Sequence, residues 1–362
     1  MKKIRWGVIG LGIGLLHAKT LKTLPNSELV AVCDSNISTL EKVREELGSI
    51  AYYSNGIKML EEENLDAIAI ATFDNKHAYL IVDAIHKGIH VFAEKPIATT
   101  QKDLGDIFQA LKSNPSVKLS TNTLLRLSPR FDLLKNKITS RELGEIFHFE
   151  ADYLYGRLEK LLSGWRSLDP NYSVTLGGAI HLVDLIMWLI EEKPNRVFGL
   201  GSDKGSRQQV KKTNSQLVSH DLRIALLEFP SGITGKISAN FGCVHPHFHK
   251  LDIYGTAGTF SNSISTTSPS GFEFRERNIS NSSSALLMQS RSILDKPELF
   301  DMEYPGVDKS ALLSSFHNSL ITNESAIVSI EEAFDVMSVC LAIDKSVKEG
   351  IPVKIDYYDI DS

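Results

Sequence analysis

Residues 4–14 read Ile-Arg-Trp-Gly-Val-Ile-Gly-Leu-Gly-Ile-Gly, an apolar run that ends in a glycine-rich turn. The run predicts a buried strand, and the pattern of residues 15–24 predicts a helix directly after the turn. Glycine lets the backbone turn tightly and approach a pyrophosphate, whose charge would face the helix N-terminus. A dinucleotide site would therefore be formed by Gly10, Gly12, Ile13 and Gly14. The spacing also occurs in plain turns and in methyltransferases, because its third glycine comes one residue early for the usual fingerprint.

The same alternation of apolar runs and helical patterns continues to about residue 122. Apolar runs cover residues 28–33, 66–71, 89–93 and 117–121, and helical patterns cover 38–47, 77–87 and 101–111. Continuous apolar strands that alternate with helices are typical of a parallel sheet covered on both faces. Residues 1–122 are therefore predicted to form a doubly wound Rossmann domain.

Asp34 ends the second predicted strand, 22 residues after Gly12. A carboxylate at this place accepts hydrogen bonds from the adenosine ribose hydroxyls and repels a 2′-phosphate, so the position favours NAD over NADP. The alternative is that Asp34 caps the following helix, because Asp-Ser-Asn is also good capping chemistry.

The pattern changes after residue 122, and residues 123–362 are predicted to form an α+β domain. Helical patterns cover 129–138, 178–190, 309–320 and 329–348, and strand patterns cover 145–155, 220–229, 233–241, 247–254, 259–260 and 351–355. Turns at 230–232 and 255–258 join successive strands, which predicts a mostly antiparallel sheet. Residues 261–306 are rich in Ser and Asn and are expected to hold short strands and mobile loops.

Composition excludes several classes of protein. The chain has 362 residues, 42% of them apolar and 23% charged, which is the usual globular mixture and argues against disorder. Its formal charge of −5 gives no basic footprint for nucleic acid or an anionic membrane. The basic and apolar start resembles a signal peptide, but its glycines suit a turn better and no small-residue cleavage site follows. Three widely spaced cysteines suit a reducing compartment, so we expect a cytoplasmic protein without membrane spans.

Glu94-Lys95-Pro96 follows the run 89–93, at the sheet edge where doubly wound folds bind ligands. A lysine there can hydrogen-bond a substrate hydroxyl beside a nicotinamide and tune its proton loss. A surface lysine in an X-Pro turn is an equally good interpretation of the tripeptide alone.

Several motifs together resemble the Gfo/Idh/MocA family of nicotinamide-dependent oxidoreductases. The resemblance covers nearly the whole chain. Its most specific part runs from Thr72 and His77 to the segment Gly-Ile-His-Val-Phe-Ala-Glu-Lys-Pro at residues 88–96. Further matches are Arg126-x-x-Pro129, residues 144–146, Gly-Gly-Ala-Ile-His-Leu-Val-Asp at 177–184, residues 253–259, and the C-terminal segment 332–353.

The resemblance implies that the first domain binds the dinucleotide and that the second presents an open sheet for substrate binding and oligomerisation. It places Lys95 and His181 at the reacting carbon, with Asp184 one helical turn beyond the histidine and able to orient it. It assigns Thr72, His77, Glu94 and Lys95 to the cofactor side of the site. The usual chemistry of the family needs no metal.

The chain departs from the family pattern at three places. The glycine loop is one residue short before His17, and Phe73 replaces the usual proline. Many members also carry an acid four residues before the catalytic histidine, where this chain has Gly177. The proton relay must then depend on Lys95, His181 or a group supplied from elsewhere.

Aromatic and basic residues that follow the first strand of the second domain are candidates for substrate binding. Aromatic faces stack on sugar rings, and guanidinium groups bind carboxylates or phosphates. As a group they indicate a polyhydroxylated and possibly anionic substrate, whereas each of them alone could equally be a rim or interface residue. The candidates are Tyr155, Arg157, Trp165 and Arg166, together with Arg126.

Cys243, His245, His247 and His249 alternate, so on a strand all four would share one face. Their ligand types suit zinc, but neighbours on one face of a strand lie ~7 Å apart in a line, and Pro246 disturbs the strand. Packing against substrate or another subunit is favoured over a metal site.

The leading hypothesis is an NAD(H)-dependent enzyme that interconverts a secondary alcohol and a ketone on a sugar, cyclitol or sugar derivative, as a homodimer or homotetramer. A second hypothesis is a non-catalytic sensor that binds the dinucleotide and reports it to a protein partner. A methyltransferase, the third, leaves Glu94-Lys95-Pro96 without an explanation. The substrate, the direction of reaction and the oligomer size are not encoded in any motif.

Overall fold

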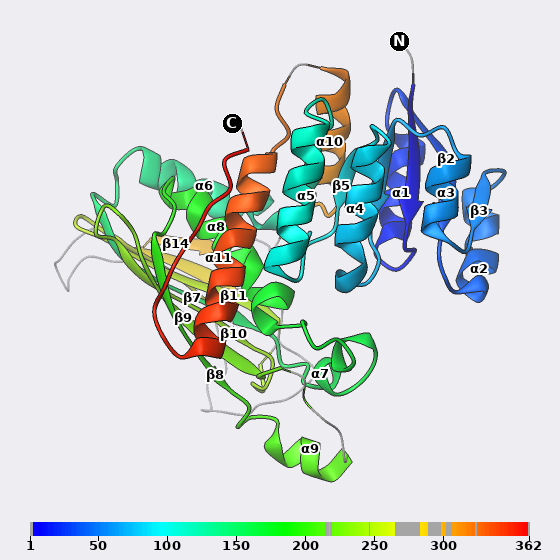
Figure 1. The fold of residues 1–362 in the computed structure, drawn as a ribbon. Helices are drawn as coiled ribbons and strands as arrows, with labels where there is room; N and C mark the ends of the chain where they lie inside the picture. The colour runs from blue at the N-terminus through cyan, green and yellow to red at the C-terminus, as the bar shows by residue number, and fades with distance from the viewer. Residues whose placement is uncertain are drawn as a thin grey trace.

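The computed structural model describes residues 3–213, 217, 219–245, 247–264, 283–288, 298–301, 306–322 and 324–360. Two sheets organise it, one at each end of the molecule, with a long helix between them (Figure 1). The region 261–306, where short strands and mobile loops were expected, lies largely outside the described residues.

The first sheet has six strands, all parallel, in the order β3-β2-β1-β4-β5-β6. Its central strands are almost wholly buried, as the continuous apolar runs predict. The strands are β1 (Ile4–Ile9), β2 (Ser27–Cys33), β3 (Ala51–Tyr53), β4 (Ala67–Ile70), β5 (His90–Ala93) and β6 (Leu119–Thr121). The predicted doubly wound fold is therefore confirmed.

Helices cover both faces of this sheet, and each connects two parallel strands (Figure 1). They are α1 (Gly14–Thr23), α2 (Ile37–Leu47), α3 (Gly56–Glu62), α4 (His77–His86) and α5 (Gln101–Ser113). A short 3-10 turn, η1 (Asp74–Lys76), precedes α4. The sequence analysis did not predict the β3–α3 unit, because β3 is a half-buried edge strand of three residues without an apolar run.

The second sheet has nine strands in the order β14-β13-β12-β11-β7-β10-β9-β8-β15. All neighbouring pairs are antiparallel except β7 and β10, which run parallel. The strands are β7 (Ile146–Leu154), β8 (Arg196–Ser202), β9 (Leu222–Glu228), β10 (Thr234–Asn240), β11 (Phe248–Gly255), β12 (Thr259–Ile264), β13 (Ser283–Met288), β14 (Glu298–Asp301) and β15 (Val353–Lys354). A mixed, mostly antiparallel sheet thus confirms the expected class, and β8 is an addition to it.

The helices after residue 122 are α6 (Pro129–Thr139), α7 (Glu159–Leu162), α8 (Ile180–Ile190), α9 (Arg207–Thr213), α10 (Ala311–Ile321) and α11 (Ile330–Glu349). Of these, α8 and α11 pack beside this sheet, whereas α10 lies against the first domain and α9 at the far end of the second (Figure 1). Short 3-10 turns lie at η2 (Leu124–Leu127) and η3 (Trp165–Ser167), and a π-helical turn, η4 (Thr175–Ala179), leads into α8. None of the helices described is long and apolar enough to cross a membrane.

The orange helix α10 lies beside α1 and α5 in Figure 1, far from the second sheet. Its residues Leu312, Leu313 and Phe316 share a buried cluster with Trp6 of β1. The Trp6 indole N–H donates to His317 Nδ1 at 3.1 Å, and the other ring nitrogen of His317 lies 2.9 Å from the Pro25 carbonyl oxygen. The C-terminal half of the chain therefore contributes a helix to the core of the first domain.

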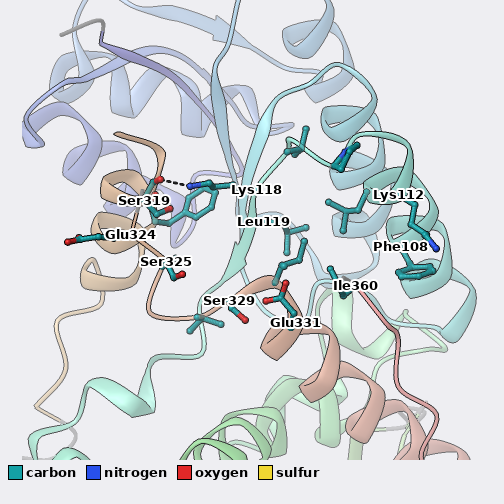
Figure 2. Close-up of a pocket in the computed structure, with 17 residues that line it drawn as sticks. Phe108, Lys112, Lys118, Leu119, Ser319, Glu324, Ser325, Ser329, Glu331 and Ile360 are labelled. Carbon is teal, nitrogen blue, oxygen red and sulfur yellow. Dashed lines mark hydrogen bonds between the residues drawn. The ribbon is translucent and has the colours of Figure 1, made fainter. Parts of the chain in front are cut away.

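A cavity of about 520 Å³ lies between α5, the start of β6 and the segment that joins α10 to α11 (Figure 2). Lys118, which precedes β6, donates from Nζ to the Ser319 carbonyl oxygen at 2.5 Å across it. This cavity adjoins the amino end of β6. Ligands of doubly wound folds bind at the other edge, outside the carboxyl ends of the strands.

Candidate functional site

A cleft of about 720 Å³ opens at the carboxyl ends of the first sheet, where the strand order reverses between β1 and β4. Loops that follow five strands line it: the glycine loop after β1, residues 34–35 after β2, 54–57 after β3, 71–74 after β4, and Glu94 and Lys95 after β5. Trp165, Arg166 and Gly177 reach it from the second domain. A doubly wound fold binds dinucleotides at this switch point.

The glycine loop has the shape that a pyrophosphate requires. Gly10 has φ +88°, and a Cβ there would lie 2.4 Å from the Ala71 carbonyl oxygen, so only glycine fits. A Cβ at Gly12 would meet no atom within 4 Å, which leaves open space beside the backbone. The N-terminus of α1 has no side-chain cap and no acid in its first turn. The N–H groups at this helix end and the open space beside Gly12 suit the binding of an anionic group.

Asp34 lies at the end of β2 on the same cleft. Its Oδ2 accepts from the Leu11 N–H at 2.8 Å, and its Oδ1 accepts from the Asn36 N–H at 2.8 Å. The cap of α2 is Asn36, whose side chain accepts from the Ser38 N–H at 3.0 Å, so the alternative that Asp34 caps this helix is wrong. Asp34 thus fixes the glycine loop while facing the cleft.

Glu94 is held from two sides at the end of β5. Its Oε1 accepts from the Asn122 side-chain amide at 2.8 Å and from His17 Nε2 at 2.9 Å. Burial raises the pKa of Glu94, but these hydrogen bonds outweigh burial and the net pKa is lowered. Sequence reasoning missed His17 and Asn122, although His17 stands one turn into the helix after the glycine loop.

His77 ties two loops of the cleft together. Its Nδ1 lies 2.8 Å from the Pro96 carbonyl oxygen, and its Nε2 lies 3.1 Å from that of Thr72. The ring is 1% exposed, and both of its nitrogens lie beside backbone carbonyl oxygens. His77 lines the cleft together with Thr72, and their expected contact with a cofactor stays a prediction.

Lys95 extends from the first domain to the second. Its Nζ donates to the Gly177 carbonyl oxygen at 2.8 Å. Burial lowers the pKa of the Lys95 ammonium, and the charges of Asp74 and Glu94 oppose this shift. A lysine with a depressed pKa gives up its proton more readily than a surface lysine does.

His181 lies just beyond Gly177, at the start of α8. Its ring stacks 6.3 Å from that of Tyr153 and meets His249 edge to face at 6.1 Å. Burial, followed by the charge of Lys95, lowers the pKa of His181 well below its ordinary value, so the ring is neutral at pH 7. Its Nδ1 is buried and has no hydrogen-bond partner within the described part of the chain.

Arg126 and Asp184 correct two expectations. Arg126 donates from Nε to Asp184 Oδ2 at 2.9 Å and from Nη2 to Asp184 Oδ1 at 2.7 Å, while its Nη1 lies 2.5 Å from Glu332 Oε1. Both side chains are almost fully buried. Asp184 therefore orients Arg126 and not His181, and Arg126 joins three segments of the fold instead of lining the cleft.

The aromatic and basic candidates form two neighbouring groups. Tyr155 Oη accepts from Lys160 Nζ at 2.7 Å and from Arg157 Nη1 at 3.3 Å. Arg166 lies 4.3 Å from the centre of the Trp165 ring, and Trp165 stacks on Phe73 at 5.1 Å across the cleft. Phe73, the residue that departs from the family's proline, therefore makes a contact between the domains that sequence reasoning missed.

The alternating Cys and His residues do not share one strand face. β10 ends at Asn240 and β11 begins at Phe248, so Cys243, His245 and His247 lie in the connection between them. His247 and His249 pack 4.8 Å apart beside Tyr153. Within the described residues, no group of three or more metal-ligating side chains comes together.

Comparison with known families identifies the chain. Residues 4–123 match the oxidoreductase family model for an NAD-binding Rossmann fold, and residues 135–355 match the C-terminal alpha/beta domain of the same family. The chain belongs to the Gfo/Idh/MocA oxidoreductase family. The resemblance drawn from residues 72–96 and 177–184 is confirmed by these matches.

Known relatives include inositol dehydrogenases. A myo-inositol 2-dehydrogenase of Thermotoga maritima is 26% identical over 262 residues, which are 70% of this chain and 74% of the relative. A scyllo-inositol dehydrogenase of Lactobacillus casei, solved with NAD(H) and scyllo-inositol, has a TM-score of 0.72 at 18% identity and covers both chains fully. The WlbA dehydrogenase of Bordetella pertussis, solved with NADH and UDP-GlcNAcA, has a TM-score of 0.75 at 19% identity over 99% of this chain and 100% of its own.

Proposed function

We propose that this family member is an NAD(H)-dependent dehydrogenase or reductase that interconverts a secondary alcohol and a ketone on a sugar, cyclitol or sugar derivative. The observation that carries the proposal is the position of Lys95. Its ammonium lies in the same cleft as the glycine loop and Asp34, and it bonds the second domain at Gly177. One cleft thus joins a dinucleotide cradle to a proton-transfer group.

The residues present fit a nicotinamide dinucleotide. The glycine loop and the N-terminus of α1 would hold the pyrophosphate, and Asp34 would accept hydrogen bonds from the adenosine ribose. Ile13, 41% exposed at the cleft, and Thr72 would flank the dinucleotide. When bound, NAD supplies the hydride acceptor for alcohol oxidation, and NADH the donor for the reverse. The Asp34 carboxylate favours NAD over NADP.

The protein's own groups would handle the proton. Lys95 would hold the substrate hydroxyl and lower its pKa through its positive charge. His181, neutral at pH 7 and with Nδ1 unpartnered within the described residues, would accept the hydroxyl proton during oxidation and return it during reduction.

Charge around the aromatic residues supports an anionic substrate. Arg157, Lys160 and Arg166 all contact Tyr155, Trp165 or Tyr172. As far as the structure describes the chain, none of the three cations has a carboxylate within ion-pair distance. Uncompensated cations beside aromatic faces suit a sugar that carries a carboxylate or phosphate.

The experiment is a screen of cyclitols, neutral sugars and uronates with NAD, followed by the absorbance of NADH. Turnover of a cyclitol or sugar supports the proposal, and a preference for uronates supports the anionic substrate. Tight NAD binding without turnover of any compound would contradict catalysis and favour a dinucleotide sensor.

The open sheet would form a homodimer or homotetramer. Leu200 and Leu226 are 57% and 54% exposed, and they lie on the face of β8 and β9 opposite Gly199, against which Val347 of α11 packs. Substituting Leu226→Lys should lower the mass measured by light scattering. An unchanged mass, or a monomeric wild type, would contradict this interface.

The three cysteines are free thiols, which supports a reducing, cytoplasmic location.

A further inference from the structure

Gly177 occupies the place where the family resemblance implies an acid, and the structure shows why no side chain stands there. A Cβ at Gly177 would lie 2.2 Å from Tyr172 Oη and 2.8 Å from Tyr172 Cζ. The Tyr172 ring is 3% exposed and packs edge to face against Trp165 at 5.7 Å. The hydroxyl end of Tyr172 therefore fills the space of the missing side chain, and it could not easily move away.

Another carboxylate reaches the cleft from the opposite domain. Asp74 begins the short turn η1 after β4, and it lines the cleft together with Lys95, Arg166 and Gly177. Phe73, the residue before Asp74, stacks on Trp165 of the second domain, with 5.1 Å between the ring centres. Within the described chain, the Asp74 carboxylate makes no hydrogen bond or ion pair that would already use it.

We propose that Asp74 is a positioning residue that keeps Lys95 in its charged form from across the cleft, in place of an acid at position 177. This inference rests on the proposed dehydrogenase function. During alcohol oxidation the Lys95 ammonium lowers the pKa of the substrate hydroxyl, and neutral His181 accepts the hydroxyl proton and releases it to water, so the reaction yields ketone, NADH and one proton.

Electrostatics agrees with this arrangement. Burial raises the pKa of Asp74, and the charges of His77, Lys95 and Arg166 oppose the shift while Asp169 adds to it. Burial lowers the pKa of Lys95, and the charge of Arg166 lowers it further. The charges of Asp74 and Glu94, and the nearby Cys340, raise this pKa. Across the shared cleft, the Asp74 charge therefore opposes the loss of the Lys95 ammonium that burial favours.

The test uses Asp74→Asn, which keeps the shape and removes the charge. We expect kcat to fall about tenfold or more, with NAD affinity unchanged. Loss of the negative charge should also lower the pKa of Lys95, so the fall of kcat at high pH, where the ammonium is lost, should begin about 1 pH unit lower than in the wild type. Asp106→Asn, an exposed acid on α5 paired with Lys102, is the matched control and should change neither quantity.

A rescue experiment separates this role from simple structural damage. In the Asp74→Asn background, Tyr172→Ala together with Gly177→Asp opens the space and restores a carboxylate, and should recover part of the lost kcat. Gly177→Asp alone should lower activity, because its side chain meets the Tyr172 ring. Wild-type kcat and pH profile in folded Asp74→Asn would overturn the proposal.

A readout without substrate distinguishes failure of this inference from failure of the proposed function. NMR titration of isotope-labelled lysine side chains, with the Lys95 signal assigned by its loss in Lys95→Arg, reports the pKa of Lys95 directly. A lower pKa in Asp74→Asn supports the coupling even if no substrate is turned over. An unchanged pKa of Lys95 refutes the coupling even in an active enzyme.

Discussion

Arg126 and Asp184 form a buried bidentate ion pair between η2 and α8, with N–O distances of 2.9 and 2.7 Å. Arg126 also contacts Glu332, the residue whose side chain completes the capping box of α11 with Ser329. One guanidinium group therefore fastens the segment after the first domain to two helices of the second. Lys95 and His181 come from these two domains, so the pair helps to maintain their relative position.

Breaking this pair should destabilise the protein strongly. Arg126→Ala leaves the Asp184 carboxylate buried without its partner, and should lower the free energy of unfolding by about 3–5 kcal/mol. Denaturant unfolding followed by circular dichroism measures the change. Replacing both residues by apolar ones, as in Arg126→Met with Asp184→Leu, should cost less than the sum of the single changes. Additive losses would contradict a direct coupling between the two side chains.

Asp34 should control cofactor choice. Asp34→Ala loses charged hydrogen bonds to the ribose and should weaken NAD binding by about 1–3 kcal/mol, measured by calorimetry. It also removes the acceptor of the Leu11 N–H, so part of that loss would come from the glycine loop itself.

Asp34→Asn serves as the matched control. It keeps an oxygen for Leu11 but removes the charge that repels a 2′-phosphate, so NADP affinity should rise relative to NAD with a smaller overall loss than in Asp34→Ala. Equal affinity of the wild type for both cofactors would refute the role assigned to Asp34.

Apart from β3 and α3, the strands and helices of the first domain are predictable because their signals are local. Each central strand is a continuous apolar run, and each helix has a repeating apolar face, so the parallel sheet follows from the sequence between Ile4 and Thr121. Asp34 and Glu94-Lys95 are found from their places at strand ends, since the carboxyl ends of parallel strands meet at one edge.

Contacts between distant segments are not predictable in this way. Arg126 and Asp184 are 58 positions apart, and the i, i+3 spacing of His181 and Asp184 suggests a pairing that the arginine prevents. The contact of Tyr172 with Gly177 depends on the π-helical turn η4, which no local pattern indicates. Phe73 meets Trp165 only because the two domains are joined at this angle.

The buried histidines should make the protein sensitive to acid. Burial lowers the pKa of His181 and His249 well below 6.5 and that of His247 to about 4. Because the unfolded chain takes up these protons first, stability is complete above about pH 6.5 and is lost as the pH falls toward 4. Each histidine should contribute about 1.4 kcal/mol per pH unit within that window.

Measuring the free energy of unfolding between pH 7 and 4.5 checks this dependence. His249→Phe should flatten the slope by about one proton. A wild-type slope that is flat over this range would show that the histidines titrate normally in the folded protein.

Lys95 gives the most direct test of catalysis. Lys95→Ala should lower kcat by about 10²–10⁴-fold, the usual contribution of a positioned proton-transfer group. NAD affinity should change little, because the pyrophosphate is held by the loop Gly10–Gly14 and not by this side chain.

Lys95→Arg should fail to restore the activity lost in Lys95→Ala. A guanidinium keeps the positive charge, but it cannot release a proton at working pH, and its planar shape does not suit the single acceptor at the Gly177 carbonyl oxygen. A purely structural lysine would give the opposite result, with both variants losing thermal stability and keeping their activity per folded molecule. Measuring the melting temperature beside kcat separates these outcomes: an unchanged kcat in folded Lys95→Ala removes the lysine from the mechanism, and the proposed coupling to Asp74 with it.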